Sequence, residues 1–394
     1  MFVIFLCYGL FSFPLESPSW GFSLDLPDNY EFTNGDGKDR FSFENPDGAK
    51  FDVSVYYDAS NRNAPFDSVE EFALDVQTKL NSSGDLELFE YMGKEAALLE
   101  LVFPLQGIGS MAGWALCFQL DHPVAPVRPG SRTTGNSSTG AKPLLLAMAY
   151  GPAAKTDLTD LHLSALDSIA PQEGDRLAPG PITEFSYPRE KRVRASIHGL
   201  DMDAWIFEED AEAAQALIDR EFQVLRRFEN APNWKEAWTR FYKAIYRDSF
   251  ERLVDIAFQV ERKLNVPARE NRDLANELLK WVQAFDYERD LMGSDFINLV
   301  SAATEGRGDC DNRAMLWAVI LIQADIPAAI MVSRNYGHAM GLADLPGAGA
   351  RFEVEGQKLL VAETTAEVSI GLIGETVSEI EHWHGIVFDI HPSR

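Results

Sequence analysis

Cysteine and basic residues are both scarce in this chain of 394 residues. Its three cysteines, Cys7, Cys117 and Cys310, are too few to form the disulfide framework of a small secreted domain. The fold must therefore depend on a packed core, for which 46% hydrophobic residues are enough. Lysine and arginine number 35 against 61 acidic residues, which gives a formal net charge of −26. Because affinity for nucleic acid comes mainly from clustered basic side chains, this composition argues against a nucleic-acid partner.

The N-terminus lacks an apolar run long enough to cross a bilayer. Met1–Phe13 is apolar but shorter than the roughly 20 residues that a spanning helix needs, and its length is typical of a signal peptide. Ser17 and Ser19 provide small residues for cleavage before Trp20, although no basic residue precedes the apolar run. We expect residues 1–19 to be a signal peptide, the protein to be periplasmic or extracellular, and no stable membrane span. The alternative is that the run forms a buried N-terminal strand.

Residues 20–170 alternate between patterns typical of strands and of helices. Period-two alternation of apolar residues predicts strands at 21–27, 39–43, 51–57, 86–91, 95–103, 114–120 and 144–150. A capping pattern at Asp67–Glu70 predicts a helix to about Leu80, and a second helix is expected at 158–169. Cys117 lies in one of the apolar strands and is expected to be an inert core residue. These elements predict an N-terminal α/β sandwich domain.

The same N-terminal domain gathers no catalytic side chains. Its opening residues, Phe22-Ser23-Leu24-Asp25-Leu26-Pro27, resemble the start of PsbP-like domains. That resemblance implies a binding or spacer role for residues 20–170.

Residues 171–266 are expected to form a linker, a hairpin and a helical segment. Proline, glycine and charged residues dominate 171–181, and apolar periodicity predicts a hairpin at 192–207 and helices at 211–228, 234–245 and 250–264. The aromatic-rich Trp234–Tyr242 could stack on sugars or peptides. Its helical spacing is more typical of core packing.

The residues best suited to chemistry lie within Thr304–Thr365. Gly306 and Gly308 lead to Cys310, and the chain then becomes almost wholly apolar as far as Ile322. This pattern predicts a loop that delivers the cysteine to the first turn of a buried helix. Backbone N–H groups and the positive end of the helix dipole would favour the thiolate there.

Two further residues are spaced to complete a catalytic triad with Cys310. Strands are expected at 326–333, 338–342, 351–354 and 358–362. His338 would begin the second of these strands, and Glu363 would follow the last one. A carboxylate in such an arrangement orients the imidazole, and the imidazole takes the proton of the thiol. Cys310, His338 and Glu363 are therefore the candidate catalytic residues.

With these residues in this order, residues 270–375 resemble the core of the transglutaminase-like, papain-related superfamily. Three departures are Met340, where an aromatic residue is usual, Glu363-Thr364-Thr365 in place of Asp-Pro-Thr, and the aspartates on either side of Cys310. The resemblance implies an α+β fold for residues 267–394, with a buried nucleophile helix packed on an antiparallel sheet. It also implies that Gln283, at the end of a helix expected at 271–285, is an oxyanion donor beside the backbone N–H of the nucleophile. The alternative for Gln283 is a solvated helix position.

Two carboxylates flank the candidate nucleophile. Asp309 and Asp311 stand on either side of Cys310, and their negative charge would oppose thiolate formation. That opposition would hold unless Arg307 or Arg313 offsets the charge.

Histidines are concentrated near the C-terminus. His382 and His384 alternate along the chain and could hold a metal with a third ligand, for which Asp389 is the nearest candidate. The alternative, which the missing third ligand favours, is that these histidines and His391 lie on the surface or pack against neighbours. We expect no cofactor.

The pattern as a whole predicts an exported thiol acyl-transfer enzyme with a Cys-His-Glu triad. The resemblance favours a cysteine peptidase or amidase that acts on a protein or peptide substrate, while a lysine amine as acceptor would make it a transglutaminase. The alternative is a catalytically inactive binding module of the same fold. The oligomeric state is left open.

Overall fold

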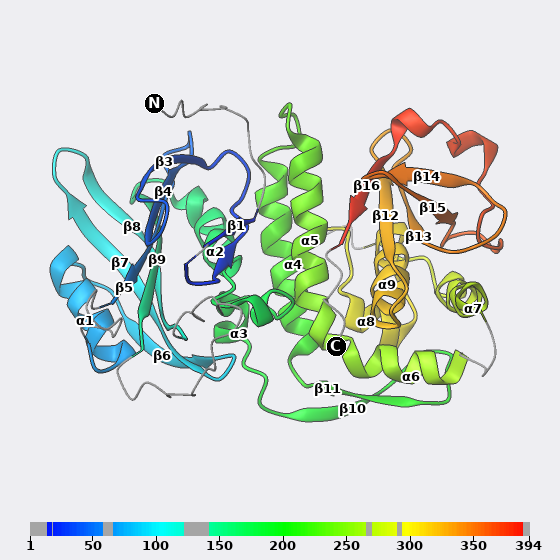
Figure 1. Cartoon of the computed structure of the whole chain (residues 1–394), viewed down its shortest axis with the longest axis horizontal. Coiled ribbons are helices and arrows are strands. Elements are labelled where there is room, and N and C mark those ends of the chain that lie inside the picture. Colours follow the sequence, from blue (N-terminus) through cyan, green and yellow to red (C-terminus); the bar gives the residue numbers. More distant parts are fainter. Residues whose placement is uncertain are drawn as a thin grey trace, which may run out of the picture. The chain divides into compact units, whose positions relative to one another are not determined.

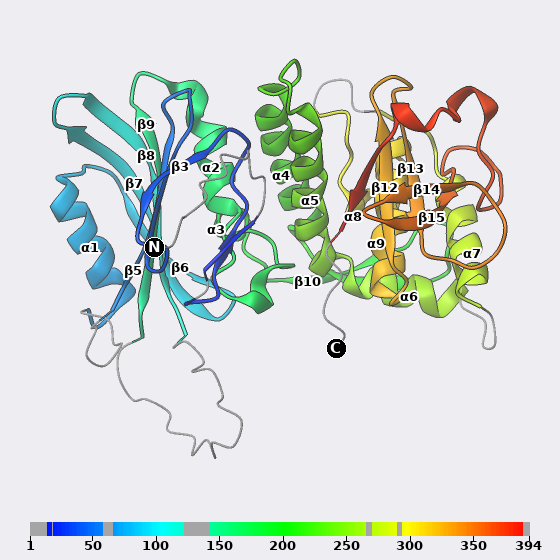
Figure 2. The same ribbon diagram turned by 45° about the horizontal axis from the view of Figure 1, so that its top comes forward.

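The computed structural model describes residues 14–17, 19–57, 66–121, 142–264, 270–289 and 294–388. It divides into two compact units, the first comprising Met1–Arg176 and Gly180–Phe185, and the second comprising Leu177–Pro179 and Ser186–Arg394. Both units combine helices with sheets, which confirms the mixed α+β class (Figure 1, Figure 2). Residues 1–13 of the expected signal peptide, together with Asp389 and His391, lie outside the described residues. Among the described helices, none is both long and apolar enough to cross a membrane.

The first unit is built on an antiparallel sheet of seven strands. In spatial order these are β3 (Glu31–Gly35), β4 (Arg40–Glu44), β5 (Lys50–Tyr56), β9 (Leu144–Pro152), β8 (Gly109–Gln119), β7 (Lys94–Leu105) and β6 (Leu86–Tyr91). The edge strand β3 is not among the predicted strands. Its five residues are all exposed, so it has no buried face and no alternating apolar pattern. A separate short pair joins β1 (Leu15–Glu16) to β2 (Ser23–Leu24).

Helices cover both faces of this sheet. They are α1 (Val69–Leu80) on one face, and α2 (Thr159–Asp167) and α3 (Pro181–Ser186) on the other (Figure 1). Successive residues of β9 point to opposite faces, so Leu144 and Leu146 pack in the cluster with α1 while Leu145 and Ala147 pack in the cluster with α2. This arrangement agrees with the α/β sandwich expected for the N-terminal domain.

In its described residues, the second unit contains a hairpin, six α-helices and a second sheet. The hairpin joins β10 (Arg192–Ser196) to β11 (Asp203–Phe207), and the helices are α4 (Asp210–Arg226), α5 (Trp234–Arg252), α6 (Val254–Leu264), α7 (Asn271–Gln283), α8 (Leu299–Glu305) and α9 (Cys310–Gln323). Helix α8 was not predicted, because seven residues are too few to show a helical period. Helices α4, α5 and α6, expected as part of a segment distinct from the catalytic domain, share one hydrophobic core with α9.

Helix α9 is buried along almost its whole length. All residues from Asn312 to Ile322 are buried, and the helix packs on β12 (Ala328–Ser333) and β13 (His338–Ala343). Gly341 of β13 allows this close packing, since a Cβ there would lie 2.5 Å from the ring of Trp317. The middle of α9 is thereby held close against the sheet.

The second sheet places two polar side chains at one edge. Its strands follow the order β14 (Arg351–Val354), β15 (Gln357–Ala362), β13, β12 and β16 (His384–Val387), and every pair is antiparallel. Gly341 of β13 pairs with Ala362 of β15. Because neighbouring strands run in opposite directions, the start of β13 lies beside the end of β15. His338 is the first residue of β13 and Glu363 follows the last residue of β15, so both side chains lie at the same end of these neighbouring strands.

Candidate active site

Helix α9 begins at Cys310 because a capping box closes its N-terminus. The Asp309 side chain accepts hydrogen bonds from the backbone N–H groups of Asp311 and Asn312, and the Asn312 side chain accepts one from the Asp309 N–H. Gly308 has a φ of 151°, and a Cβ there would lie 2.8 Å from the Asn312 Cβ. The loop therefore requires glycine at this position to deliver Cys310 to the first turn.

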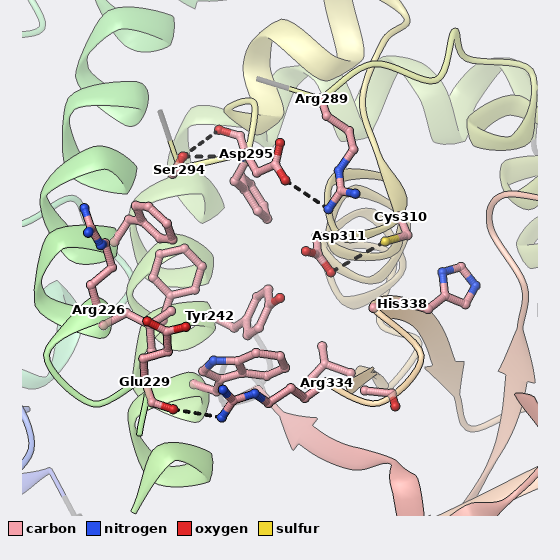
Figure 3. Close-up of a pocket in the computed structure, with 18 residues that line it drawn as sticks. Arg226, Glu229, Tyr242, Arg289, Ser294, Asp295, Cys310, Asp311, Arg334 and His338 are labelled. Carbon is pink, nitrogen blue, oxygen red and sulfur yellow. Dashed lines mark hydrogen bonds and ion pairs between the residues drawn. The ribbon is translucent and has the colours of Figure 1, made fainter. Parts of the chain in front are cut away.

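A cavity of about 530 Å³ opens over the start of α9. Its walls come from α4, α5, the segments on either side of residues 290–293, the first turn of α9 and the turn between β12 and β13. The residues that line it are Phe222, Leu225, Arg226, Glu229, Trp238, Phe241, Tyr242, Arg289, Ser294, Asp295, Phe296, Cys310, Asp311, Val332, Ser333, Arg334, Gly337 and His338. Figure 3 shows Cys310, Asp311, His338 and Arg289 on one side, and Arg226 and Glu229 on the other. The cavity thus joins a polar end, where the candidate nucleophile lies, to an aromatic wall.

His338 and Glu363 form a hydrogen-bonded pair. His338 Nε2 lies 2.9 Å from Glu363 Oε2, and Thr365 donates from both its backbone N–H (2.8 Å) and its hydroxyl (2.6 Å) to the other carboxylate oxygen, Oε1. Burial alone would raise the pKa of Glu363, but the hydrogen bonds from His338 and Thr365 bring it below its usual value. The carboxylate is therefore ionised and held in one orientation. Since Nε2 is occupied, Nδ1 is the ring nitrogen left for exchange with the thiol.

An aromatic residue of the C-terminal segment packs beside the His338 ring. Trp383 is buried, and its ring centroid lies 6.1 Å from that of His338 in an edge-on arrangement. The Trp383 indole donates to the backbone oxygen of Val377, which fixes the ring. An apolar neighbour of this kind helps to keep water from competing for the histidine–carboxylate hydrogen bond. Trp383 was not predicted as part of the site, because no spacing in the sequence connects it to Cys310 or His338.

Gln283 does not reach the cavity, and its predicted role as an oxyanion donor is corrected here. Its side-chain amide donates to the backbone oxygens of Glu363 (2.8 Å) and Val368 (2.9 Å), which uses both of its N–H groups. It is absent from the cavity lining. Gln283 therefore supports the segment that carries Glu363, and its position is neither catalytic nor simply solvated.

Cys310 is a neutral thiol in this environment. Burial, Asp311 and Asp309 raise the pKa of the Cys310 thiol, while the Ala339 backbone N–H and Arg289 offset this only in part. The sulfur lies 4.0 Å from Asp311 Oδ1, to which the thiol donates, and within the described residues no hydrogen bond joins Sγ to His338. The expectation that the helix start would favour the thiolate is corrected accordingly, because burial and two carboxylates outweigh the helix dipole.

The arginine that lies near the carboxylates flanking Cys310 is Arg289, which was not predicted from the sequence. Arg289 contacts Asp309 at 3.8 Å and Asp295 at 2.9 Å. Arg307, one of the two expected partners, pairs with Glu288 and Glu305 instead. Arg289 lies some twenty residues upstream of Cys310, so no spacing rule pointed to it.

Arg313, the other expected partner, is also used elsewhere. It donates to the backbone oxygens of Gly308 and Phe285, and it lies over the ring of Tyr287. It therefore holds the loop before Cys310 in place. The charge of Asp309 still acts on the pKa of Arg313, but within the described residues Arg313 forms no ion pair with Asp309 or Asp311.

Asp311 projects into the cavity and has an unusual environment. Burial and the neighbouring Asp309 raise the pKa of Asp311 to about 7, while a hydrogen bond from the Tyr242 phenol and the charges of His338 and Arg289 oppose the rise. Burial and nearby carboxylates also raise the pKa of Tyr242, so its hydroxyl keeps its proton. A carboxyl group that titrates near neutrality beside a candidate nucleophile is typical of functional sites.

The histidines of the C-terminal segment have partners among neighbouring residues. His384 lies 2.8 Å from the Thr239 hydroxyl, and His382 contacts Glu379 and Asn335. Their rings point to separate neighbours, which does not support a shared metal site.

A second group of possible ligands surrounds the nucleophile. Asp309, Cys310 and Asp311 offer ligand atoms within 4.8 Å of one another. Asp309 already accepts two backbone N–H groups and contacts Arg289, and Asp311 accepts a hydrogen bond from Tyr242. We therefore assign no metal to this group.

The aromatic-rich segment Trp234–Tyr242 was expected either to pack in the core or to contact a ligand, and its residues both pack in the core and line the cavity. Phe241 and Tyr242 are buried in the core of the second unit, and together with Trp238 they also line the cavity. Helices α4 and α5 thus provide one wall of the candidate active site.

Comparisons with known proteins do not establish a family. No family model and no curated protein matches the chain. Among solved structures, the PsbP protein CyanoP of Synechocystis matches with 12% identity and a TM-score of 0.27, over 42% of this chain and 95% of that protein. A crystal structure of a candidate protease from Parabacteroides distasonis matches with 10% identity and a TM-score of 0.21, over 74% of this chain and 42% of that protein. Similarity at this level identifies neither a family nor an activity.

Proposed function

We propose that the second unit is a thiol acyl-transfer enzyme of the transglutaminase-like type, with Cys310 as nucleophile, His338 as general base and Glu363 as the residue that orients it. The observation that carries the proposal is the His338–Glu363 pair at the edge of the cavity that Cys310 also lines. The buried nucleophile helix on an antiparallel sheet is the architecture that this class of enzyme would need.

The raised pKa of the thiol determines how the first step would proceed. Because Cys310 is neutral at rest, His338 Nδ1 takes its proton as the sulfur attacks the carbonyl carbon. The imidazolium then gives that proton to the leaving amine, and Glu363 stabilises the charged ring throughout. The product is an acyl thioester on Cys310.

The second nucleophile decides between hydrolysis and transfer. Water would make the protein a cysteine peptidase or amidase, and a lysine amine would make it a transglutaminase. We favour hydrolysis of a peptide or carboxamide substrate by an exported enzyme. The cavity is lined by aromatic side chains, which suits a peptide side chain beside the scissile bond.

The alternative is a binding module that keeps the fold without turnover. The raised pKa and 3% exposure of Cys310 favour this alternative, because both reduce the reactivity of a thiol. Slow alkylation of the free protein cannot decide between the two, since a neutral thiol with a general base would also alkylate slowly. Turnover has to be measured.

The deciding experiment compares wild type with Cys310→Ala, and uses Cys117→Ala as a matched control. Ammonia release and amine incorporation would be measured on glutamine donors, alongside cleavage of casein. We expect activity in the wild type and in Cys117→Ala, and none in Cys310→Ala. Activity that survives in Cys310→Ala would refute the mechanism, and inactivity of the wild type in all three assays would favour the binding module.

A further inference from the structure

The cavity lacks the oxyanion donor that the sequence predicted, because Gln283 gives both of its amide N–H groups to backbone oxygens. A tetrahedral intermediate at Cys310 would carry a negative oxygen that needs donors. The backbone N–H of Cys310, at the first position of α9, can supply one of them. The remaining donor must come from another group that lines the cavity.

Two hydroxyl-bearing groups face the cavity close to the sulfur. They are the carboxyl group of Asp311, 4.0 Å from Sγ, and the phenol of Tyr242, whose interaction with that carboxyl group lowers the pKa of Asp311. In Figure 3 the Tyr242 hydroxyl points toward Asp311 from the opposite wall. The two groups come from α9 and α5, so the cavity lies between them.

We propose that Asp311, in its protonated form and supported by Tyr242, is the side-chain donor that stabilises the oxyanion formed at Cys310. This inference rests on the proposed acyl-transfer function. An oxyanion bonded to the same carbon as Sγ sits within about 3 Å of the sulfur, and its donors sit about 2.7–3.1 Å from it. A carboxyl oxygen 4.0 Å from Sγ is within that reach.

Attack of the sulfur on the carbonyl carbon does not require Asp311 to give up its proton. The sulfur forms a bond to the carbonyl carbon, the π pair of the C=O bond moves onto oxygen, and His338 holds the thiol proton. Asp311 donates a hydrogen bond and keeps its proton. When the intermediate collapses, the pair returns to form C=O, the bond to the leaving nitrogen breaks, and that nitrogen takes the proton from His338. A carboxylic acid kept neutral by its surroundings can act as such a donor.

The groups that face Asp311 set the pH range in which it can donate. Asp309 and burial favour its protonated form, while Tyr242 from α5, His338 from β13 and Arg289 from the segment after α7 favour the carboxylate. With the pKa of Asp311 at about 7, the donor is present below that pH and is lost above it. Once ionised, Asp311 would also repel both the thiolate and the oxyanion. Acylation should therefore fall as the pH rises through about 7.

The test separates acylation from alkylation. Acetylation of Cys310 by p-nitrophenyl acetate passes through an oxyanion, whereas alkylation by iodoacetamide does not. Asp311→Ala is expected to lower the acetylation rate constant at about pH 6 by roughly 10²-fold or more, without lowering the alkylation rate. Asp311→Asn keeps an N–H donor that does not titrate, so its acetylation should lose the fall above about pH 7. It should also alkylate faster than wild type above that pH, because a negative charge beside the sulfur is gone.

A second variant guards against a folding defect in Asp311→Ala. Tyr242→Phe removes the hydrogen bond that lowers the pKa of Asp311, so the fall in acetylation should move to higher pH. Wild-type acetylation that rises steadily from about pH 6 to 9 with the same profile as Asp311→Asn would overturn the proposal. So would an Asp311→Ala protein with native circular dichroism and an unchanged acetylation rate. If the wild type forms no acetyl-Cys310 at any pH, it is the acyl-transfer function itself that fails.

Discussion

Within the described residues, each of the two units buries one cysteine, and the surroundings of the two sulfurs differ. Cys117 lies on β8 in the first unit, is 0% exposed, and packs with Leu99 and Ala115 beneath α1. Cys310 in the second unit is 3% exposed but opens a helix and lines a cavity. Burial raises the pKa of both thiols, and only Cys310 also has carboxylates, an arginine and a backbone N–H acting on its sulfur.

The comparison shows that burial does not distinguish an inert thiol from a candidate nucleophile. Both thiols are neutral at rest, and they differ in the groups that could take their proton. Cys117 has apolar neighbours on a sheet covered on both faces, whereas Cys310 shares its cavity with His338, whose partner is Glu363. The edge of the second sheet and the start of α9 create that difference. Side chains at the start of a helix and at the ends of two strands can lie close together. A side chain in the middle of a strand, such as Cys117, is surrounded by its own sheet and the covering helix.

The largest expected effect is the loss of acyl transfer when one sulfur is removed and the other is kept. Cys310→Ala should lower kcat/KM by at least about 10⁴-fold, because no other group can form the thioester. Cys117→Ala should leave kcat/KM within a few-fold of wild type and should lower only the thermal midpoint. Equal effects of the two substitutions on kcat/KM would remove the distinction between the two sites.

Removing the base should have the next largest effect. His338→Ala is expected to lower kcat by about 10²–10⁴-fold, because the neutral thiol then loses its proton acceptor. The control is Glu379→Ala, which removes an exposed contact of His382 and should leave kcat unchanged. Wild-type turnover in His338→Ala would mean that another group takes the proton.

Replacing Gln283 tests whether it supports or catalyses. Gln283→Ala should lower the free energy of unfolding by about 1–3 kcal/mol, because two backbone oxygens lose their donor. Its effect on kcat should be smaller than that of Asp311→Ala. Asn276→Ala is the matched control, since Asn276 also lies on α7 and accepts a hydrogen bond from Ile370 of the same following segment. A loss of kcat near 10²-fold in Gln283→Ala with unchanged stability would restore it as an oxyanion donor.

The smallest expected effect is on the pH dependence of stability. The pKa of Asp311 is raised from 3.8 to about 7 on folding, so the folded protein binds an extra proton between these values. The contribution of Asp311 to stability is therefore fully present below about pH 4 and is lost as the pH rises through about 7. The thermal midpoint of Asp311→Asn should rise relative to wild type across that window. Parallel curves would show that Asp311 is not perturbed.

Much of the fold could be predicted from the periodicity of apolar residues. The elements that could not be predicted lack such a pattern for physical reasons. The strands of the first sheet other than β3, and helix α9, were predicted because buried faces impose apolar patterns at two-residue and helical spacing. Strand β3 and helix α8 were missed, since one has no buried face and the other is too short.

Cys310, His338 and Glu363 were predicted as nucleophile, base and orienting acid from their order along the chain. The residues that modify them were harder to find. Tyr242, Arg289 and Trp383 reach the site from α5, an irregular segment and the C-terminal region, and no spacing rule connects them to Cys310. Asp311 was noticed for its charge, but its proton depends on burial and on Tyr242, which only the folded arrangement shows. Gln283 was assigned by resemblance, and its hydrogen bonds exclude that role.

The most direct measurement is peptide mapping by mass spectrometry after a brief reaction with an activated ester. We predict an acyl group on the peptide that contains Cys310, none on the peptide that contains Cys117, and a strongly reduced acyl signal in His338→Ala. Equal acylation of the two cysteines, or a Cys310 signal that persists undiminished in His338→Ala, would contradict the account.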